Sequence, residues 1–321
     1  MMLQMRFDLR APSFGAPIAD IYRGALEMSE WAERQGFSMV ALSEHHGSDD
    51  GYCPSPLVVA AAITARTTTL RVLVAALVLP LHDPVRLAED LAVLDVVSGG
   101  RVDVVLGAGY VPAEFDMFGV DLEDRVARLE AGVEVLRRAW SGERFEHGGR
   151  TVTVTPRPLR ERGPMLLLGG ASPGAARRAA RIADGFAPVD ASLWPVYAAE
   201  CERLGRPAIG APPSGGPGFI HVTDDVDAAW ERIAPHALHE TNAYARWLAQ
   251  SDGVAVYREF DDADALRASG RYAVMTPAEC VEHVRATGEL RLHPLMGGLP
   301  PDVAWQSLDL IEHEVLPALR G

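Results

Sequence analysis

Lysine is absent from this chain of 321 residues, so all 30 of its Lys and Arg positive charges are arginines. The absence excludes chemistry that depends on a lysine amine: a Schiff base with a carbonyl substrate or pyridoxal phosphate, a P-loop lysine on a nucleotide, and a lysine general base. A fixed positive charge in a functional site must therefore come from arginine, histidine or a metal ion.

Positive charge is also scarce relative to negative charge. The chain carries 44 Asp and Glu against 30 positive groups, which gives a formal net charge of −14. Broad binding to a phosphate backbone requires clustered positive charge, so we set nucleic acid aside as a partner.

Cysteine and long apolar runs are scarce as well. The cysteines are odd in number, far apart and never in a C-x-x-C arrangement, so they indicate neither a disulfide framework nor a thiolate metal site. They are Cys53, Cys201 and Cys280. No run approaches the length of a membrane span, and the first ten residues carry Arg6, Asp8 and Arg10 where a signal peptide needs apolar residues. We expect a cytoplasmic protein that neither spans a membrane nor is exported.

Short aliphatic runs alternate along the chain with stretches of helical period, which is typical of βα units around a parallel sheet. The predicted strands are residues 5–9, 39–43, 70–79, 102–106, 165–168, 186–189, 219–222 and 290–293. The main predicted helices are residues 18–35, 56–66, 125–140, 173–183, 193–204, 225–239, 277–287 and 303–319. The pattern favours one α/β domain over residues 1–321, a (β/α)8 TIM barrel rather than an open doubly wound sheet. Two insertions are expected, a hairpin at 145–155 and a segment of uncertain shape at 240–272, after the seventh strand.

In such a barrel the functional site lies at the carboxyl ends of the strands. Polar residues and glycines follow several predicted strands directly. They are Glu44-His45-His46, Leu81-His82-Asp83, Gly107-Ala108-Gly109-Tyr110, Gly169-Gly170-Ala171-Ser172 and His293.

His45 and His46 are adjacent residues leaving a strand, so their side chains point to opposite sides and are not expected to share a metal ion. One of them is a candidate catalytic histidine, and the alternative is a structural histidine at a strand end. No H-x-H or H-E-x-x-H motif supports a metal site. We expect His236 and His239, three residues apart on a helix, to lie at the surface.

The turn at Gly169, Gly170 and Ser172 is a candidate phosphate site. Two glycines allow close backbone approach, Ser172 stands at a helix N-cap, and Pro173 follows at the first helical position. The alternative is an ordinary turn that uses these residues for capping alone. Arg125 and Arg128 are either counter-charges for a phosphate or part of a solvated helix face. Ala75 and Ala76, inside the third strand, by themselves indicate only close packing.

Residues 42–130 contain the runs SEHHGSDDGYCPSPLVV and RVDVVLGAGYVPAEFDMFGVDLEDR. This stretch closely resembles the bacterial luciferase-like flavin-dependent monooxygenases, and the resemblance continues more weakly at 166–186 and 293–308. It implies an eight-fold barrel that binds reduced FMN or the reduced deazaflavin F420. It also implies that His45 is the catalytic histidine beside the ring, and that Ala75-Ala76 forms a non-proline cis peptide under the ring. Gly169, Gly170 and Ser172 match a segment near the phosphate.

The luciferase has a phosphate-binding arginine where this chain has Ala108, so the resemblance leaves phosphate binding to Arg125 and the helix terminus. The turn at Gly107 and Gly109 is also similar to that of deazaflavin-using relatives. The leading hypothesis is a monooxygenase that uses reduced FMN from a separate flavin reductase, molecular oxygen and a small organic substrate.

Two alternatives stay open: a deazaflavin-dependent dehydrogenase or reductase, and a non-catalytic flavin-binding or partner subunit, against which the presence of His45 argues. The resemblance further implies a homodimer formed through helices such as 56–66, and a lid at 240–272.

Overall fold

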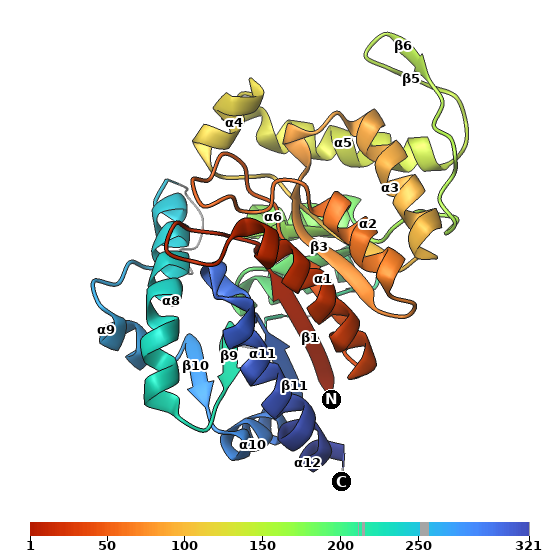
Figure 1. Ribbon diagram of the computed structural model, residues 1–321. Helices are drawn as coiled ribbons and strands as arrows, with labels where there is room; N and C mark the ends of the chain where they lie inside the picture. Colours follow the sequence, from red (N-terminus) through yellow and green to blue (C-terminus); the bar gives the residue numbers. More distant parts are fainter. Residues whose placement is uncertain (211, 214–215, 251–256, 321) are drawn as a thin grey trace.

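A parallel, curled sheet of seven strands lies at the centre of the protein, in the order β11-β1-β2-β3-β4-β7-β8. The structure is a computed structural model that describes residues 1–210, 212–213, 216–250 and 257–320. Figure 1 shows helices arranged around the strands. The strands of the sheet are β1 (Met2–Phe7), β2 (Met39–Leu42), β3 (Arg71–Val78), β4 (Val102–Gly107), β7 (Leu166–Gly170), β8 (Gly185–Pro188) and β11 (Glu289–Leu292).

Helices follow most strands, as the alternating sequence pattern predicts. Several begin at a side chain that accepts a backbone N–H in the first turn, such as Asp83, Ser172 and Thr276. The helices are α1 (Ile18–Arg34), α2 (Pro56–Arg66), α3 (Pro84–Ser98), α4 (Pro112–Phe118), α5 (Arg125–Trp140), α6 (Pro173–Ile182), α7 (Trp194–Arg203), α8 (Val226–Leu248), α9 (Ala263–Ala268), α10 (Pro277–Thr287), α11 (Pro301–Leu310) and α12 (Leu316–Arg320). Across the described ranges, no helix combines the length and apolar character needed to cross a bilayer.

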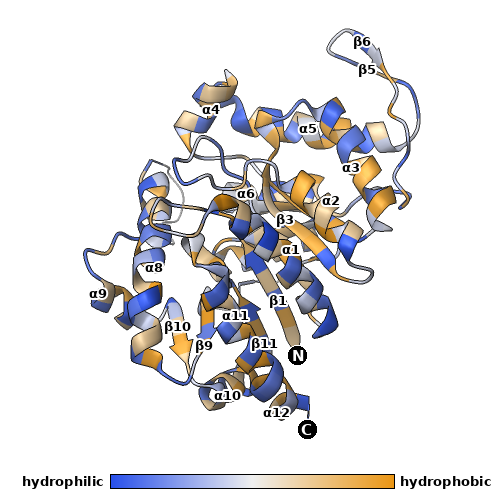
Figure 2. Ribbon diagram, viewed as in Figure 1, coloured by the Kyte–Doolittle hydropathy of each residue, from blue (hydrophilic) through white to orange (hydrophobic). Residues whose placement is uncertain are grey.

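The two faces of β1 differ in chemistry. Leu3, Met5 and Phe7 are buried in the main apolar cluster, between the sheet and its helices. Because side chains alternate along a strand, Gln4 and Arg6 point to the opposite, inner face. Figure 2 shows apolar colouring along β3, whereas α1 and α8 alternate between polar and apolar residues. The inner face of β1 is thus polar, where barrel interiors are usually filled by branched aliphatic side chains.

The predicted seventh strand, β9 (Phe219–Val222), does not join this sheet. It pairs in parallel with β10 (Tyr272–Met275), a strand that the sequence reading did not anticipate. β9 packs beside β11, but in the described part of the chain no strand ladder links β9 or β10 to the seven-stranded sheet. The structure therefore shows a curled half-barrel, and closure into eight strands stays a prediction.

The predicted helix 225–239 is too short. Helix α8 continues through Pro235 to Leu248. The buried residues Ala237, Thr241 and Tyr244 keep one apolar face running past the predicted end. Much of the expected insertion at 240–272 is thus the end of α8 together with α9, while residues 251–256 lie outside the described residues. The predicted hairpin at 145–155 is confirmed as β5 (Phe145–His147) and β6 (Arg150–Val152), which project from the body in Figure 1.

Candidate active site

His45 lies just beyond the end of β2 and bonds to a carboxylate from another element. Its Nδ1 is 2.8 Å from Glu114 Oε1, and the same oxygen accepts the backbone N–H of His46 at 2.9 Å. Both side chains are buried. Because an ionised carboxylate only accepts hydrogen bonds, the proton between them sits on Nδ1 of His45. This arrangement fixes the ring and leaves Nε2 to exchange a proton with a bound molecule.

Glu44 organises the neighbouring loop. Its Oε1 accepts from His46 Nε2 at 3.0 Å and from His82 Nε2 at 2.7 Å, and its Oε2 accepts the N–H of Val78. Burial alone would raise the pKa of Glu44, but these hydrogen bonds outweigh it and lower the pKa to about 2. His45 and His46 thus bond through their rings to different carboxylates, as their opposite orientations predict.

Aromatic rings surround His45. Trp247 stacks on it with ring centroids 4.3 Å apart, and Tyr52 meets it edge-on at 4.8 Å. Tyr244 lies 6.0 Å away, and its hydroxyl is 2.7 Å from that of Tyr52. Arg10 is fully buried, and its guanidinium carbon lies 4.6 Å from the ring centroid of Tyr52. The imidazole therefore sits in a largely apolar enclosure beside a fixed positive charge.

The Arg10 guanidinium belongs to a buried ionic network. It pairs with Asp50 and lies 3.4 Å from Asp8. His293 lies between two carboxylates, with Nε2 3.5 Å from Asp8 and Nδ1 3.5 Å from Glu240. Burial would raise the pKa of Asp8, but the charges of His293 and Arg10 lower it to about 2.

Asp8, Glu240 and His293 are also the one described group that brings three potential metal-binding atoms within 4.8 Å of one another. However, Arg10 lies 3.4 Å from Asp8, and Arg6 lies 3.4 Å from Glu240. These guanidinium groups already compensate the carboxylates, so we interpret the group as an ionic network and assign no metal to it.

The peptide bond between Ala75 and Ala76 is cis, which confirms the geometry expected from the resemblance. The register of β3 with β4 skips a residue between Ala75 and Leu77 at this point. Gly107 lies close by, since a Cβ built on it would stand 3.2 Å from the Cβ of Ala76. On β7, Leu168 pairs with Leu106, so the next residues in register are Gly107 and Gly169. Small residues on adjacent strands thus form a floor at the carboxyl end of the sheet.

The turn after β7 has the predicted capping geometry. Ser172 Oγ accepts the N–H of Ala175 at 3.2 Å. A Cβ on Gly170 would stand only 2.3 Å from the Cβ of Ala175, so glycine is required there for α6 to pack against its strand. The capping interpretation accounts for these residues, and a phosphate at the same helix terminus stays a prediction.

The two candidate counter-charges differ in exposure. Arg125 is half-buried and donates to the carbonyl of Leu122 at 2.9 Å, whereas Arg128 is exposed and donates to the carbonyl of Pro80 at 2.9 Å. Helix α5 packs beside α6, so Arg125, in the first turn of α5, starts a helix that neighbours the Ser172 turn. Gly109 is required by its backbone, with φ of +76°.

The expected surface position of His236 is wrong. It is buried, with Nδ1 2.8 Å from the carbonyl oxygen of Gly297, and burial lowers its pKa. His239 is partly exposed and lies 2.7 Å from Asp50.

Several residues of the site were not predicted from the sequence, among them Tyr52, Glu114, Tyr244, Trp247 and Arg10. Glu114 lies in α4, a helix that is absent from the predicted elements, although Pro112 at its first position is a helix signal. Tyr244 and Trp247 lie on the unpredicted end of α8, where their spacing of three was the available signal. Arg10 follows β1, and nothing in its local sequence distinguishes it from a surface arginine.

The curled parallel sheet, the His45–Glu114 pair and the cis peptide define an α/β protein with its candidate site at the carboxyl ends of strands. The chain belongs to the luciferase-like monooxygenase family, whose model matches residues 5–293.

Its relatives include enzymes with two kinds of cofactor. The F420-dependent glucose-6-phosphate dehydrogenase of Microbacterium testaceum is 28% identical and is matched over 100% of this chain and 99% of its own. The FMNH(2)-dependent dimethylsulfone monooxygenase of Pseudomonas putida is 28% identical over 50% of this chain and 47% of its own. The chain spans about half the length of several curated relatives that it matches. The crystal structure of the monooxygenase RslO1 from Streptomyces bottropensis shares the fold, with a TM-score of 0.77 at 24% identity over 99% of both chains.

Proposed function

We propose that this protein is a flavin-dependent oxidoreductase, a monooxygenase that uses reduced FMN and molecular oxygen on a small organic substrate. The observation that carries the proposal is the buried His45–Glu114 pair at the carboxyl end of β2, beside the small residues Ala75 and Ala76 on the adjacent strand β3. The same pair argues against a non-catalytic subunit, because a buried histidine oriented by a carboxylate is typical of acid–base chemistry.

The floor of the site suits a flat ring system. Ala76 and Gly107 leave no bulky side chain above the strand ends, and Gly169 continues the small surface onto β7. When bound, the reduced flavin would supply the electrons for oxygen activation and substrate oxidation. In this arrangement Ala75 and Ala76 support the ring, and the aromatic enclosure of Trp247 and Tyr52 excludes water from it.

His45 would exchange a proton with the reacting edge of the cofactor through its Nε2 nitrogen. Glu114 keeps Nδ1 protonated, so Nε2 accepts a proton or returns one without a change of ring orientation. The phosphate would lie at the Gly169, Gly170 and Ser172 turn, where the positive end of α6 attracts an anion. Arg125 is the neighbouring positive charge. Gly107 and Gly109 shape the turn that approaches the cofactor.

A second candidate function is an F420-dependent dehydrogenase, in which oxygen plays no part. It is favoured by one observation: the F420-dependent glucose-6-phosphate dehydrogenases of Microbacterium testaceum and Intrasporangium calvum are each matched over at least 99% of both chains. The monooxygenase proposed first would receive its reduced FMN from a separate flavin reductase. We also propose that the chain forms a homodimer and that the described parts of 240–272 form a lid over the site.

The test is a titration of the purified protein with FMN and with F420, each oxidised and reduced, followed by oxygen consumption in the presence of reduced cofactor. We expect reduced FMN to bind at micromolar concentration. His45→Gln should slow reoxidation, whereas His313→Gln, at an exposed residue between α11 and α12, should not. If the protein binds F420 but not FMN, the monooxygenase proposal is wrong and the dehydrogenase proposal takes its place. If it binds neither cofactor, both proposals are refuted.

A further inference from the structure

A large cavity in the described part of the chain lies inside the half-barrel, away from the residues predicted to bind the cofactor. Its volume is about 1060 Å³, which is at the upper end of the range for small-molecule sites. Its wall includes the inner faces of β1 and β11, the residues that follow β8, and the segment that leads into β10. None of the predicted cofactor-binding residues, from Ala75 to Ser172, lines it.

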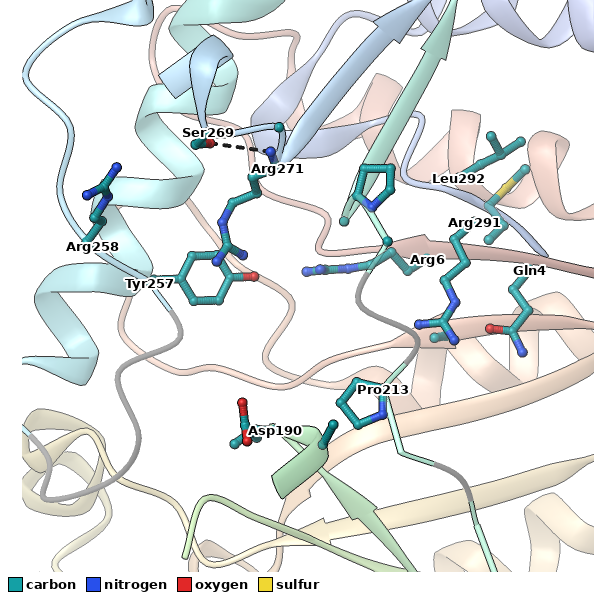
Figure 3. Close-up of a pocket in the computed structure, with 18 of the residues that line it drawn as sticks. Gln4, Arg6, Asp190, Pro213, Tyr257, Arg258, Ser269, Arg271, Arg291 and Leu292 are labelled. Atoms are coloured by element: carbon teal, nitrogen blue, oxygen red, sulfur yellow. Dashed lines mark hydrogen bonds between the residues drawn. The ribbon is translucent and has the colours of Figure 1, made fainter. Parts of the chain in front are cut away.

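Among the residues that the structure describes, four arginines line this cavity, against a single acidic residue. The acidic residue is Asp190, and the arginines are Arg6, Arg258, Arg271 and Arg291. Figure 3 shows the side chains of Arg6, Arg271 and Arg291 directed into the same space, with Asp190 on the opposite side. In a protein with a net charge of −14, this wall is a local reversal of charge. A cleft that concentrates one sign of charge attracts a ligand of the other sign.

The strand register explains how two of these charges come together. Gln4 of β1 pairs with Arg291 of β11, and Arg6 lies two residues further along the same face. Arg291 pairs with Glu289 at 3.1 Å, and its Nε is buried without a hydrogen-bond partner. Arg6 reaches Glu240 and the Tyr244 hydroxyl only through Nη2, at 3.4 and 3.3 Å. Since a guanidinium has five N–H donors, both groups retain donors for a ligand.

The cavity adjoins the enclosure around His45. Tyr257 lines the cavity and stacks on Tyr244 with ring centroids 4.7 Å apart. Tyr244 in turn lies 6.0 Å from the His45 ring. A molecule in the cavity is therefore separated from the histidine by this pair of tyrosines.

We propose that this cavity binds an organic ligand that carries at least two separated anionic groups of the carboxylate type. Arg6 and Arg291 lie on the adjacent strands β1 and β11, whereas Arg258 and Arg271 belong to the segment that leads into β10, so a longer dianion can reach both sets of arginines at once. Arginine forks bind carboxylates through paired hydrogen bonds.

The experiment compares pimelate, a seven-carbon dicarboxylate, with heptanoate, the seven-carbon monocarboxylate, by calorimetric titration of the flavin-free protein at low ionic strength. We expect pimelate to bind at least about tenfold more tightly, since it gains a second charge-assisted contact. Inorganic phosphate should bind more weakly than pimelate. Equal affinity for pimelate and heptanoate, or tighter binding of phosphate, would overturn the proposal.

Arg291→Gln should reduce the preference for pimelate to within about twofold, and so should Arg271→Gln, whose side chain Figure 3 shows directed into the cavity, over the ring of Tyr257. Arg162→Gln is the matched control, because that side chain is 80% exposed and lies outside the cavity. A preference that survives both cavity variants would also overturn the proposal. Because no flavin is present, a failure of the proposed cofactor chemistry leaves this result unchanged.

Discussion

Removal of the Glu44 carboxylate should make the free energy of unfolding less dependent on pH in the acid range. In the folded protein the pKa of Glu44 falls from 4.5 to about 2, although burial opposes the change, because His46, His82 and the Val78 N–H bond to the ionised form. The ionised form therefore stabilises the fold above pH 4.5, and this stabilisation is lost as the pH falls toward 2. At about 1.4 kcal/mol for each tenfold change, the full effect is about 3 kcal/mol, of which about 2 kcal/mol is lost between pH 7 and pH 3.

The assay is urea unfolding of the native protein and Glu44→Gln at pH 7 and pH 3. The wild type should lose about 2 kcal/mol more unfolding free energy than the variant over this interval. Glu134→Gln, whose side chain is 72% exposed, is the control and should follow the wild type. Equal losses in the wild type and in Glu44→Gln would refute the assignment of Glu44 as the buried acceptor of this loop.

Three further outcomes follow from the contacts. Glu114→Gln should slow reoxidation of bound reduced flavin at least about tenfold, with flavin affinity unchanged, because a neutral amide stabilises positive charge on the His45 ring less than a carboxylate does; an unchanged rate in stopped-flow measurements would exclude this role. Gly170→Ala should lower the unfolding free energy by about 1–3 kcal/mol, since the new methyl group meets Ala175 at 2.3 Å, while Gly174→Ala, 3.8 Å from its nearest neighbour, should not. Val58→Glu, on α2 where this valine is 71% exposed, should convert the proposed dimer to a monomer in sedimentation, and a monomeric wild type would contradict the dimer.

The sequence predicts the order of strands and helices well, because aliphatic runs and capping residues act locally. Both the cis geometry of Ala75–Ala76 and the cap at Ser172 were predicted, the first from the resemblance and the second from its position before Pro173. Each depends on residues that are close together along the chain.

Contacts between distant segments could not be predicted in the same way. The bond from His45 to Glu114 joins residues 69 apart, and the contact of Arg10 with Trp247 depends on α8 continuing past its expected end. The pairing of β9 with β10, and not with the seven-stranded sheet, likewise depends on tertiary contacts. Nothing in the local sequence of β9 indicates which strand it pairs with. The charged inner faces of β1 and β11 follow from the alternation of side chains along a strand, so they could be predicted from the sequence.

The central claim is that the strand ends around Ala76 and Gly107 hold a reduced flavin or deazaflavin. Its most direct test is an anaerobic titration of the wild type and Gly107→Val with reduced FMN and reduced F420. The branched side chain at 107 would project into the floor, where a first carbon already stands 3.2 Å from Ala76. The wild type should bind at least one cofactor at micromolar concentration, and the variant should bind it at least about tenfold more weakly. Equal binding by both proteins, or no binding of either cofactor to the wild type, would contradict it.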